Sequence, residues 1–231
     1  MTITLYELVG ENRELSFSPH CWKTRFALAH KGLEAARVPI GFSEKETIAF
    51  SGQPLVPVIT DDDNVINDSW AIAEYLEEAY PDRPSLFGSD AAKALAQSIN
   101  EWVNTGLAVH LRKLVIMPIY QAIPEHEKAY FREDRERKLG MTLEAFDALA
   151  DGAVEQVQTE LASVRELLSM QPYLGGGAPN YADIAMLGTF MWVRCTSPRQ
   201  FLSETDIVNV WYENMLDQYH QLGRNAVTAY C

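Results

Sequence analysis

The stretch LSFSPHCWKTRFAL, residues 15–28, decides how the fold around it is interpreted. Ser18 and Pro19 are typical of a helix start, because a serine hydroxyl can accept a hydrogen bond from a free N–H of the first turn and proline suits the first helical position. Apolar residues then recur at helical spacing, namely Trp22, Phe26, Ala29 and Leu33. The stretch therefore predicts a helix that begins at Pro19 and ends near Gly32.

Short extended segments surround this helix. Residues 2–8 carry β-branched and aromatic side chains at period two, which predicts a strand before the helix. Further strands are predicted over residues 36–40, 56–60 and 64–68, the last two joined by a turn of aspartates. Residues 68–80 then have the pattern of an amphipathic helix. The first part of the chain is therefore predicted to run in the order β-α-β-loop-β-β-α.

The second part of the chain has a different pattern. Proline and glycine recur just after residue 80, which is typical of a linker. Beyond it, helical periodicity predicts helices over residues 91–117, 125–139, 143–170, 181–195 and 204–222. We therefore expect an α/β domain over residues 1–80, a linker over 81–90 and an all-helical domain over 91–231.

Composition and charge narrow the functional classes. The 231 residues carry a formal net charge of −13, so the phosphates of nucleic acid and anionic membrane surfaces would be repelled. No apolar run reaches the roughly 18 residues of a membrane span, and no basic segment leads into an apolar one at the start. The three cysteines form no disulfide framework, which indicates reduced thiols. We expect a cytoplasmic protein that binds neither nucleic acid nor membranes and has no metal site.

The helix start could also carry chemistry. Unpaired N–H groups and the positive end of the helix dipole stabilise an anion there. Shifting the pKa of a bound thiol from about 8.5 to about 6.5 takes roughly 2.7 kcal/mol. One hydrogen bond from a hydroxyl to a charged group supplies about 1.5–3 kcal/mol, so a serine at a helix end could activate a thiol without a base. Cys21 stands inside the first turn, and we expect it to be a buried structural residue.

Two further motifs could shape a binding site. Val56-Pro57 precedes a predicted strand, and a cis peptide bond there would expose the Val56 N–H and C=O to an extended peptide ligand. Asp68 and Ser69 have the chemistry of a helix cap, but they could also bind the ammonium and carboxylate groups of a ligand. Either pair has a purely structural interpretation when taken alone.

In the helical part, Asn180 and Asp183 have the spacing of a capping box. Taken together, these features resemble the glutathione transferase superfamily, whose members join a thioredoxin-like domain to an all-helical one. The matching features are the cis-proline loop at Val56-Pro57, the acidic-serine pair at Asp68-Ser69, the linker and the capping box. Within the superfamily, the sequence is most similar to the bacterial lignin β-etherase and fungal etherase-related group, through residues 18–28, 68–76 and 80–84.

The resemblance implies a serine-type transferase that uses glutathione as co-substrate. Ser18 takes the position of the thioredoxin-type nucleophile and is the first candidate for activating the thiol. Ser16 and Tyr6 are the other candidates. Asp68 and Ser69 would hold the γ-glutamyl end of glutathione.

The rest of the expected site also follows from the resemblance. Val56 would pair with the cysteinyl backbone, and Gln53 or Lys45 would reach a carboxylate. The thiolate would attack a hydrophobic, aromatic co-substrate, and in an etherase the attacked carbon bears an aryloxy leaving group. We expect the co-substrate cleft between the domains, with Trp22, Trp102, His110 and Tyr120 as candidate walls. The resemblance also implies a homodimer.

Two other functions remain open at this point. One is a non-catalytic member that binds glutathione or another ligand. The other is a thiol transferase that uses Cys21, although the motif S-P-H-C lacks the second cysteine of a dithiol.

Overall fold

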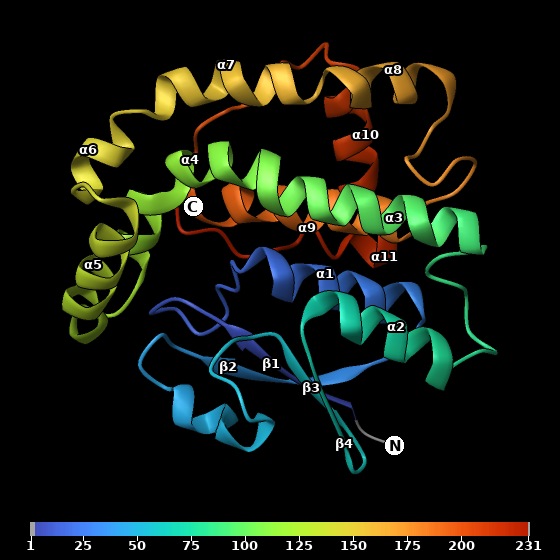
Figure 1. Cartoon of the computed structure of the whole chain (residues 1–231), viewed down its shortest axis with the longest axis horizontal. Helices are drawn as coiled ribbons and strands as arrows, with labels where there is room; N and C mark the ends of the chain where they lie inside the picture. The colour runs from blue at the N-terminus through green and yellow to red at the C-terminus, as the bar shows by residue number, and fades with distance from the viewer. Residues whose placement is uncertain (1–2, 231) are drawn as a thin grey trace.

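The computed structural model describes residues 3–230, shown as a ribbon in Figure 1. The strands are β1 (Ile3–Leu8), β2 (Ala35–Ile40), β3 (Val58–Asp61) and β4 (Asn64–Asn67), in the sheet order β2-β1-β3-β4. β1 and β2 are parallel, while β3 pairs antiparallel with both β1 and β4. A parallel pair needs a crossover connection, and α1 (Pro19–His30) supplies it. The predicted β-α-β-β-β-α order is confirmed by α2 (Ser69–Ala79).

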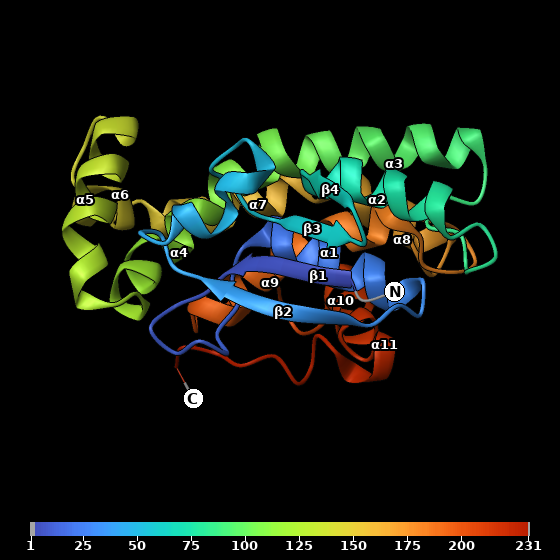
Figure 2. The same ribbon diagram turned by 90° about the horizontal axis from the view of Figure 1, so that it is seen from below.

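The sheet is covered on both faces. On one face, α1 and α2 lie between the sheet and the helical domain, as Figures 1 and 2 show. On the other face, Ile48 packs with Ile40 and Val58 in a small second core. Ile48 belongs to a 3-10 helix over Lys45–Ser51, which the sequence pattern predicted as a loop. This short helix matters for the site because it begins at Lys45.

The helical domain contains most of the remaining residues. Its helices are α3 (Asp90–Trp102), α4 (Ala108–Ala122), α5 (Glu125–Leu139), α6 (Leu143–Asp147), α7 (Ala150–Glu160), α8 (Ala162–Met170), α9 (Tyr181–Thr196), α10 (Ile207–Leu216) and α11 (Gln218–Gln221). The predicted helices over 125–139 and 181–195 agree with α5 and α9. The other three were predicted as single helices, and this is wrong, because each is broken. The first is interrupted by a π-helical turn, Val103–Leu107, and helical periodicity survives such single-turn breaks.

Helix α9 forms the centre of the molecule and is buried over almost its whole length. It packs closely against α1, and Gly188 is the reason that it can. A Cβ atom at Gly188 would lie 2.6 Å from Lys23 Cγ and 3.0 Å from the carbonyl oxygen of Pro19. Only glycine therefore allows this approach between the sheet domain and the helical domain. No helix among residues 3–230 is both long and apolar enough to span a bilayer.

The start of α9 has the capping box that the sequence predicts. The Asn180 side chain accepts a hydrogen bond from the Ala182 N–H at 2.8 Å, and Asp183 accepts one from the Asn180 N–H at 3.1 Å. Asp183 also accepts hydrogen bonds from two further N–H groups, at Leu174 and Gly175, and from Trp211 Nε1. One buried carboxylate therefore joins the start of α9 to α10 and to the loop that precedes α9.

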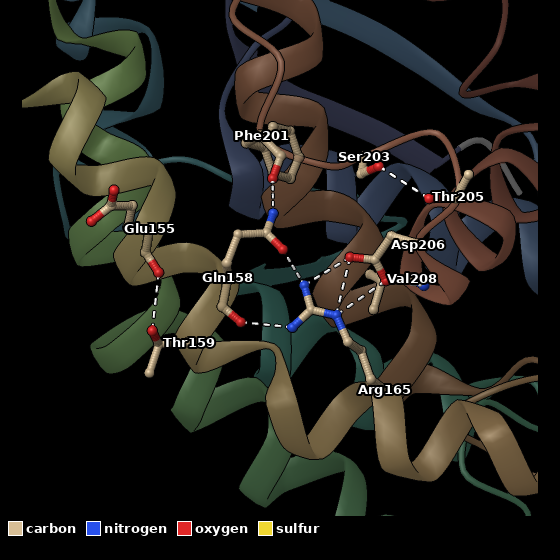
Figure 3. Close-up of polar contacts among 9 residues, drawn as sticks. All are labelled: Glu155, Gln158, Thr159, Arg165, Phe201, Ser203, Thr205, Asp206 and Val208. Carbon is tan, nitrogen blue, oxygen red and sulfur yellow. Dashed lines mark hydrogen bonds and ion pairs between the residues drawn. The ribbon is translucent and has the colours of Figure 1, made fainter.

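A second polar cluster joins α8 to α10 on the side away from β1, and Figure 3 shows it in detail. The Arg165 guanidinium donates to both carboxylate oxygens of Asp206, at 2.7 Å from Nη2 to Oδ2 and 3.2 Å from Nε to Oδ1. It also donates to the carbonyl oxygen of Gln158 at 2.7 Å. Asp206 in turn caps α10 through the Val208 N–H. This bidentate pair fixes the outer helices to one another.

Candidate functional site

A cleft lies where the end of β1 and the start of α1 meet α4, α5 and α9. It consists of two adjoining cavities of about 410 and 280 Å³. The smaller, the sheet-side cavity, is lined by Lys45 and Val56, and the larger, the helix-side cavity, by Arg112 and Trp192. Both are lined by Ser18, His20, Phe42, Phe131, Arg135 and Lys138. Because they share this boundary, one ligand could react with another across it.

Ser18 lies on the boundary between the two cavities. It is the N-cap of α1, and its Oγ accepts a long hydrogen bond of 3.4 Å from the Cys21 N–H, with Pro19 at the first helical position. That bond uses an oxygen lone pair, so the hydroxyl proton remains for a ligand atom. The side chain is 7% exposed, which is little for bulk solvent but sufficient for contact with a ligand in the cleft. Ser18 is therefore placed where an anion would also meet the positive end of α1.

The other two candidates for thiol activation lie elsewhere. The Ser16 hydroxyl donates to Glu7 Oε2 at 2.8 Å in the interior, and Arg37 forms an ion pair with the same carboxylate. Tyr6 packs edge-on against Phe50, with ring centroids 5.2 Å apart. Neither Ser16 nor Tyr6 is among the described residues that line the two cavities. The geometry thus favours Ser18 over both.

Cys21 occupies an environment unsuited to a nucleophile. Its side chain is completely buried, as is that of Cys195, and both thiols are free. Burial, and then the charge of Glu7, raises the pKa of the Cys21 thiol to about 12. A thiol with such a pKa is protonated at neutral pH and nucleophilically weak. The third cysteine of the sequence, Cys231, lies outside the described residues.

Of the two expected glutathione-binding motifs, the first lines the sheet-side cavity through Val56, whereas Asp68 and Ser69 are not among the described residues that line either cavity. The Val56-Pro57 peptide bond is cis, as predicted, and Val56 lines the cavity. Asp68 has φ 72° and ψ 130°, a conformation that costs a non-glycine residue about 1–3 kcal/mol. Its Oδ1 accepts hydrogen bonds from two N–H groups of α2, at 2.8 Å and 3.1 Å, while the residue is exposed. Backbone strain of this kind is frequent at ligand-binding positions, and Asp68 adjoins Ser69, whose Oγ lies 3.4 Å from Nδ1 of the cavity-lining His20.

Ser69 is held from the helical domain. It is 2% exposed, and its carbonyl oxygen accepts a 2.8 Å hydrogen bond from the buried Tyr181 hydroxyl on α9. Its own Oγ lies 3.4 Å from Nδ1 of His20. The position of this candidate ligand group therefore depends on the contact between the two domains.

Of the two residues expected near a ligand carboxylate, one lies in the cleft. Lys45 lines the sheet-side cavity, and its Nζ donates to the Tyr130 hydroxyl at 2.7 Å. The Gln53 amide is turned back onto its own loop, where it accepts from the Leu55 N–H at 2.6 Å and donates to the Leu55 carbonyl at 2.7 Å. The structure therefore favours Lys45 as the carboxylate-binding group.

The prediction that four aromatic residues form the walls of the co-substrate cleft is wrong. None of Trp22, Trp102, His110 and Tyr120 is among the described residues that line the two cavities. The indole N–H groups of the two tryptophans donate to Ser16 O and Glu160, at 2.9 Å and 3.0 Å. His110 bonds to Gln156, and Tyr120 packs on Phe131 and Arg132. The apolar walls are instead Phe17, Phe42, Ile116, Phe131 and Trp192, which helical spacing did not distinguish from other core residues.

The sequence analysis also missed a buried polar group at the domain junction. Lys23 is fully buried on α1, and its Nζ donates to Oδ1 of Asn100 at 2.9 Å and of Asn104 at 2.7 Å. Asn104 belongs to the π-helical turn and lines the helix-side cavity. Since its oxygen is used by Lys23, its amide N–H groups remain for a ligand. A π-helical turn beside a cleft is a frequent sign of function.

Burial lowers the pKa of both His20 and Lys23. It lowers the pKa of His20 to about 4, so the imidazole in the cleft is neutral at physiological pH. It lowers the pKa of Lys23 to about 7, against the opposing charge of Asp68. The position of His20 directly after Ser18-Pro19 could have indicated from the sequence that it lies near the site. A lysine within a helix buried on all sides gives no such signal.

The shifted pKa of Lys23 makes stability depend on pH. Its pKa is lower in the folded state than the ordinary 10.5, so the unfolded chain binds more protons between pH 7 and 10.5 and stability rises with pH there. We expect Lys23→Met to lose this contribution, which amounts to at most about 1.4 kcal/mol per pH unit. Urea denaturation of both proteins at pH 7 and pH 9 measures it. If the two proteins gave parallel stability curves, Lys23 would not be the group that titrates.

Comparison with known proteins places this geometry in a family. A family profile described as "Glutathione S-transferase, C-terminal domain" matches residues 94–221. A second, "Glutathione S-transferase, N-terminal domain", matches residues 17–79. Glutathione S-transferase Z1 of Arabidopsis thaliana is 32% identical over 111 residues, covering 46% of this chain and 50% of that protein. Glutathione S-transferase U22 of the same plant is 24% identical over 179 residues, 76% of this chain and 69% of that protein.

Solved structures show the same fold. Glutathione transferase GSTFuA3 of Phanerochaete chrysosporium superposes with a TM-score of 0.84 at 23% identity, covering 95% of this chain and 97% of that one. CsGST63524 of Ceriporiopsis subvermispora, solved in complex with glutathione, gives 0.82 at 23% identity, covering 96% and 97%. The chain spans about half the length of the first curated relatives, at 50% for two of them. Because the C-terminal profile alone matches more than half of the sequence, this chain belongs to the glutathione S-transferase family.

Proposed function

We propose that this protein is a serine-type glutathione transferase that activates the thiol of glutathione with Ser18. The observation that carries the proposal is the position of Ser18, at the start of α1 and on the boundary between the two cavities. A thiol brought there receives a hydroxyl hydrogen bond and lies at the positive end of a helix. Family membership supports glutathione as the co-substrate.

In this proposal glutathione lies extended from the sheet-side cavity to Asp68 and Ser69 at the start of α2. Asp68 takes the γ-glutamyl ammonium, and the Ser69 N–H and hydroxyl take its carboxylate. Val56 offers its backbone to the cysteinyl residue, and Lys45 offers its ammonium to the glycyl carboxylate. The cysteinyl sulfur then lies close to Ser18, with the helix-side cavity beyond it.

The electrophile is proposed to bind in the helix-side cavity. Its walls are aromatic and aliphatic, which suits a hydrophobic aromatic molecule. For a β-aryl ether, the thiolate forms a new C–S bond, the C–O bond breaks, and the electron pair leaves on the aryloxide, which takes a proton from solvent. The etherase resemblance of the sequence supports an aryloxide as the leaving group, and an aryl halide would react in the same way with loss of halide.

Two experiments test the proposal in sequence. Isothermal titration calorimetry measures whether the full chain binds glutathione. Turnover is then measured with glutathione and either a β-aryl ether or a chloronitroarene, corrected for the uncatalysed reaction. Turnover of either substrate supports the proposal. Binding without turnover favours a non-catalytic ligand-binding protein, and absence of binding refutes the glutathione site.

The thiol-transferase alternative has little structural support, because Cys21 is buried and its pKa is raised. The resemblance also leads us to propose a cytoplasmic homodimer. Light scattering coupled to size-exclusion chromatography measures the oligomeric state: a particle near twice the chain mass of 26.0 kDa supports the dimer, and one near the chain mass contradicts it.

A further inference from the structure

Helix α5 of the helical domain forms one wall of the sheet-side cavity. The lining residues that it contributes are Tyr130, Phe131, Asp134, Arg135 and Lys138, and the other described lining residues all lie within the first 56 positions of the chain. A ligand in this cavity is therefore in contact with both domains.

Contacts between α5 and the loop after β2 hold this wall in place. Glu127 Oε1 accepts hydrogen bonds from the N–H and from the hydroxyl of Ser43, at 2.8 Å and 2.7 Å. A Cβ atom at Gly41 would lie 2.5 Å from the same oxygen, so glycine leaves room for the carboxylate. The rings of Phe42 and Phe131 pack edge-on, with centroids 5.2 Å apart. The first two turns of α5 and the loop that leads into the 3-10 helix therefore form one unit.

Lys45 and Tyr130 meet at this unit, and both line the sheet-side cavity. Lys45 Nζ donates to the Tyr130 hydroxyl oxygen at 2.7 Å, and it also lies 5.1 Å from the centroid of the Tyr130 ring. Among residues 3–230, Lys45 has no ion pair, and the Tyr130 hydroxyl proton has no acceptor within hydrogen-bond distance. The ammonium thus keeps two N–H groups for a ligand, and the phenol, on a side chain that is 45% exposed, keeps its O–H.

Two donors that meet at one point fit a carboxylate. Its two oxygens carry about four lone-pair sites, so it can accept from the ammonium and from the phenol at the same time. The carboxylate already in the cavity wall, that of Asp134, does not replace it, because Asp134 is paired with three cations of its own helix. Positive charge therefore remains in excess at this end of the cavity, which favours an anionic group over a neutral one.

We propose that Tyr130 binds the glycyl carboxylate of glutathione together with Lys45, so that the helical domain selects for the intact tripeptide. This inference rests on the proposed function, in which the glycyl end of glutathione lies at Lys45. It adds a specificity to that function. A thiol without a carboxylate at this position binds less tightly, because one donor from each domain is left without its acceptor.

Isothermal titration calorimetry of the full chain tests this inference without any turnover. The two ligands are glutathione and its monoethyl ester, in which the glycyl carboxylate is esterified. We expect Tyr130→Phe to weaken the binding of glutathione by about tenfold, the loss of one hydrogen bond to a charged group, and to change the binding of the ester less than twofold. Phenylalanine keeps the ring beside the ammonium, so this variant removes the hydroxyl alone.

A double-mutant cycle tests whether the two groups bind the same carboxylate. Lys45→Met should also weaken the binding of glutathione by about tenfold. Because each group holds the other as well as the ligand, the double variant should lose about 20-fold rather than the product of the single losses, about 100-fold. A loss equal to the product would show that Lys45 and Tyr130 act on separate groups and would overturn the inference.

The control variant is Tyr120→Phe, which removes a phenol hydroxyl of α4 outside both cavities. It should leave the binding of both ligands unchanged. The inference is overturned if the wild-type protein binds glutathione and the ester equally, if Tyr130→Phe weakens both equally, or if Tyr120→Phe has the same effect. These outcomes leave the glutathione site itself intact, whereas absence of binding of both ligands to the wild-type protein refutes the proposed function and this inference with it.

Steady-state kinetics then separate binding from chemistry. Tyr130 lines the sheet-side cavity only, whereas Ser18 lies on the boundary with the helix-side cavity. With a chloronitroarene as second substrate, Tyr130→Phe should raise KM for glutathione by about tenfold and leave kcat within about twofold, since the lost interaction is equal in the ground state and the transition state. A fall in kcat at unchanged KM would overturn the assignment of Tyr130 to the glycyl end.

Discussion

Replacing Ser18 by glycine should lower kcat/KM for glutathione conjugation by about 10- to 100-fold, because a hydroxyl hydrogen bond to a thiolate contributes about 1.5–3 kcal/mol. Glycine is the informative substitution because Ser18 is also the N-cap of α1. A serine-to-glycine change at an N-cap costs only a few tenths of a kcal/mol, so the protein should remain folded. The loss then reports on chemistry rather than on the stability of α1.

The pH–rate profile shows how the loss arises. The apparent pKa of the bound thiol should rise by about 1–2 units in Ser18→Gly, since each unit corresponds to about 1.4 kcal/mol. Ser16→Ala is the matched control: it removes a hydroxyl that bonds to Glu7 inside the protein, and the thiol pKa should not change. A larger rise in Ser16→Ala than in Ser18→Gly would show that the wrong serine has been assigned. Cys21→Ala should retain activity.

Replacing Asp183 by alanine should lower the free energy of unfolding by roughly 3–5 kcal/mol, the largest effect on stability that we expect. Its carboxylate accepts hydrogen bonds from three backbone N–H groups and from the Trp211 indole, all at 2.8–3.1 Å. Burial raises the pKa of this carboxyl, while those four donors favour its charged form. Alanine would leave three buried donors, and the part-buried Gly175 N–H, without this acceptor.

Urea denaturation measures this loss. Ser89→Ala is the control, because Ser89 caps α3 through the Ala92 N–H at an exposed position, where the loss should be about 1 kcal/mol. Asp183→Asn should fall between the two, since its amide keeps one acceptor oxygen and brings an N–H₂ group against donors. A loss below about 1 kcal/mol in Asp183→Ala would mean that water satisfies the donors and that Asp183 is an ordinary cap.

Local features of this molecule were predictable wherever neighbouring residues in the chain decide them. The start of α1 at Ser18-Pro19 and the capping box from Asn180 to Asp183 depend on contacts within one helical turn. The order in which the strands follow one another along the chain before α2 was predicted from period-two alternation and short turns. The cis peptide at Val56-Pro57 was expected on the resemblance to a family and is present.

Features that depend on distant residues were predicted less well. The helix predicted over residues 91–117 is interrupted at Val103–Leu107, because a π-helical turn adds one residue without disturbing the apolar stripe. Trp22 was expected in the cleft and lies in the core, since helical spacing shows that a face is buried but not what buries it.

The order of local elements and the caps were therefore inherent in the sequence, because they rest on contacts between residues close in the chain. The choice between Ser16 and Ser18 was not. It depends on Glu7, which takes the Ser16 hydroxyl into the interior and leaves Ser18 on the cleft. The pairing of Lys45 with Tyr130 likewise arises only when α5 packs against the loop after β2, since long-range packing joins residues that are far apart in the sequence.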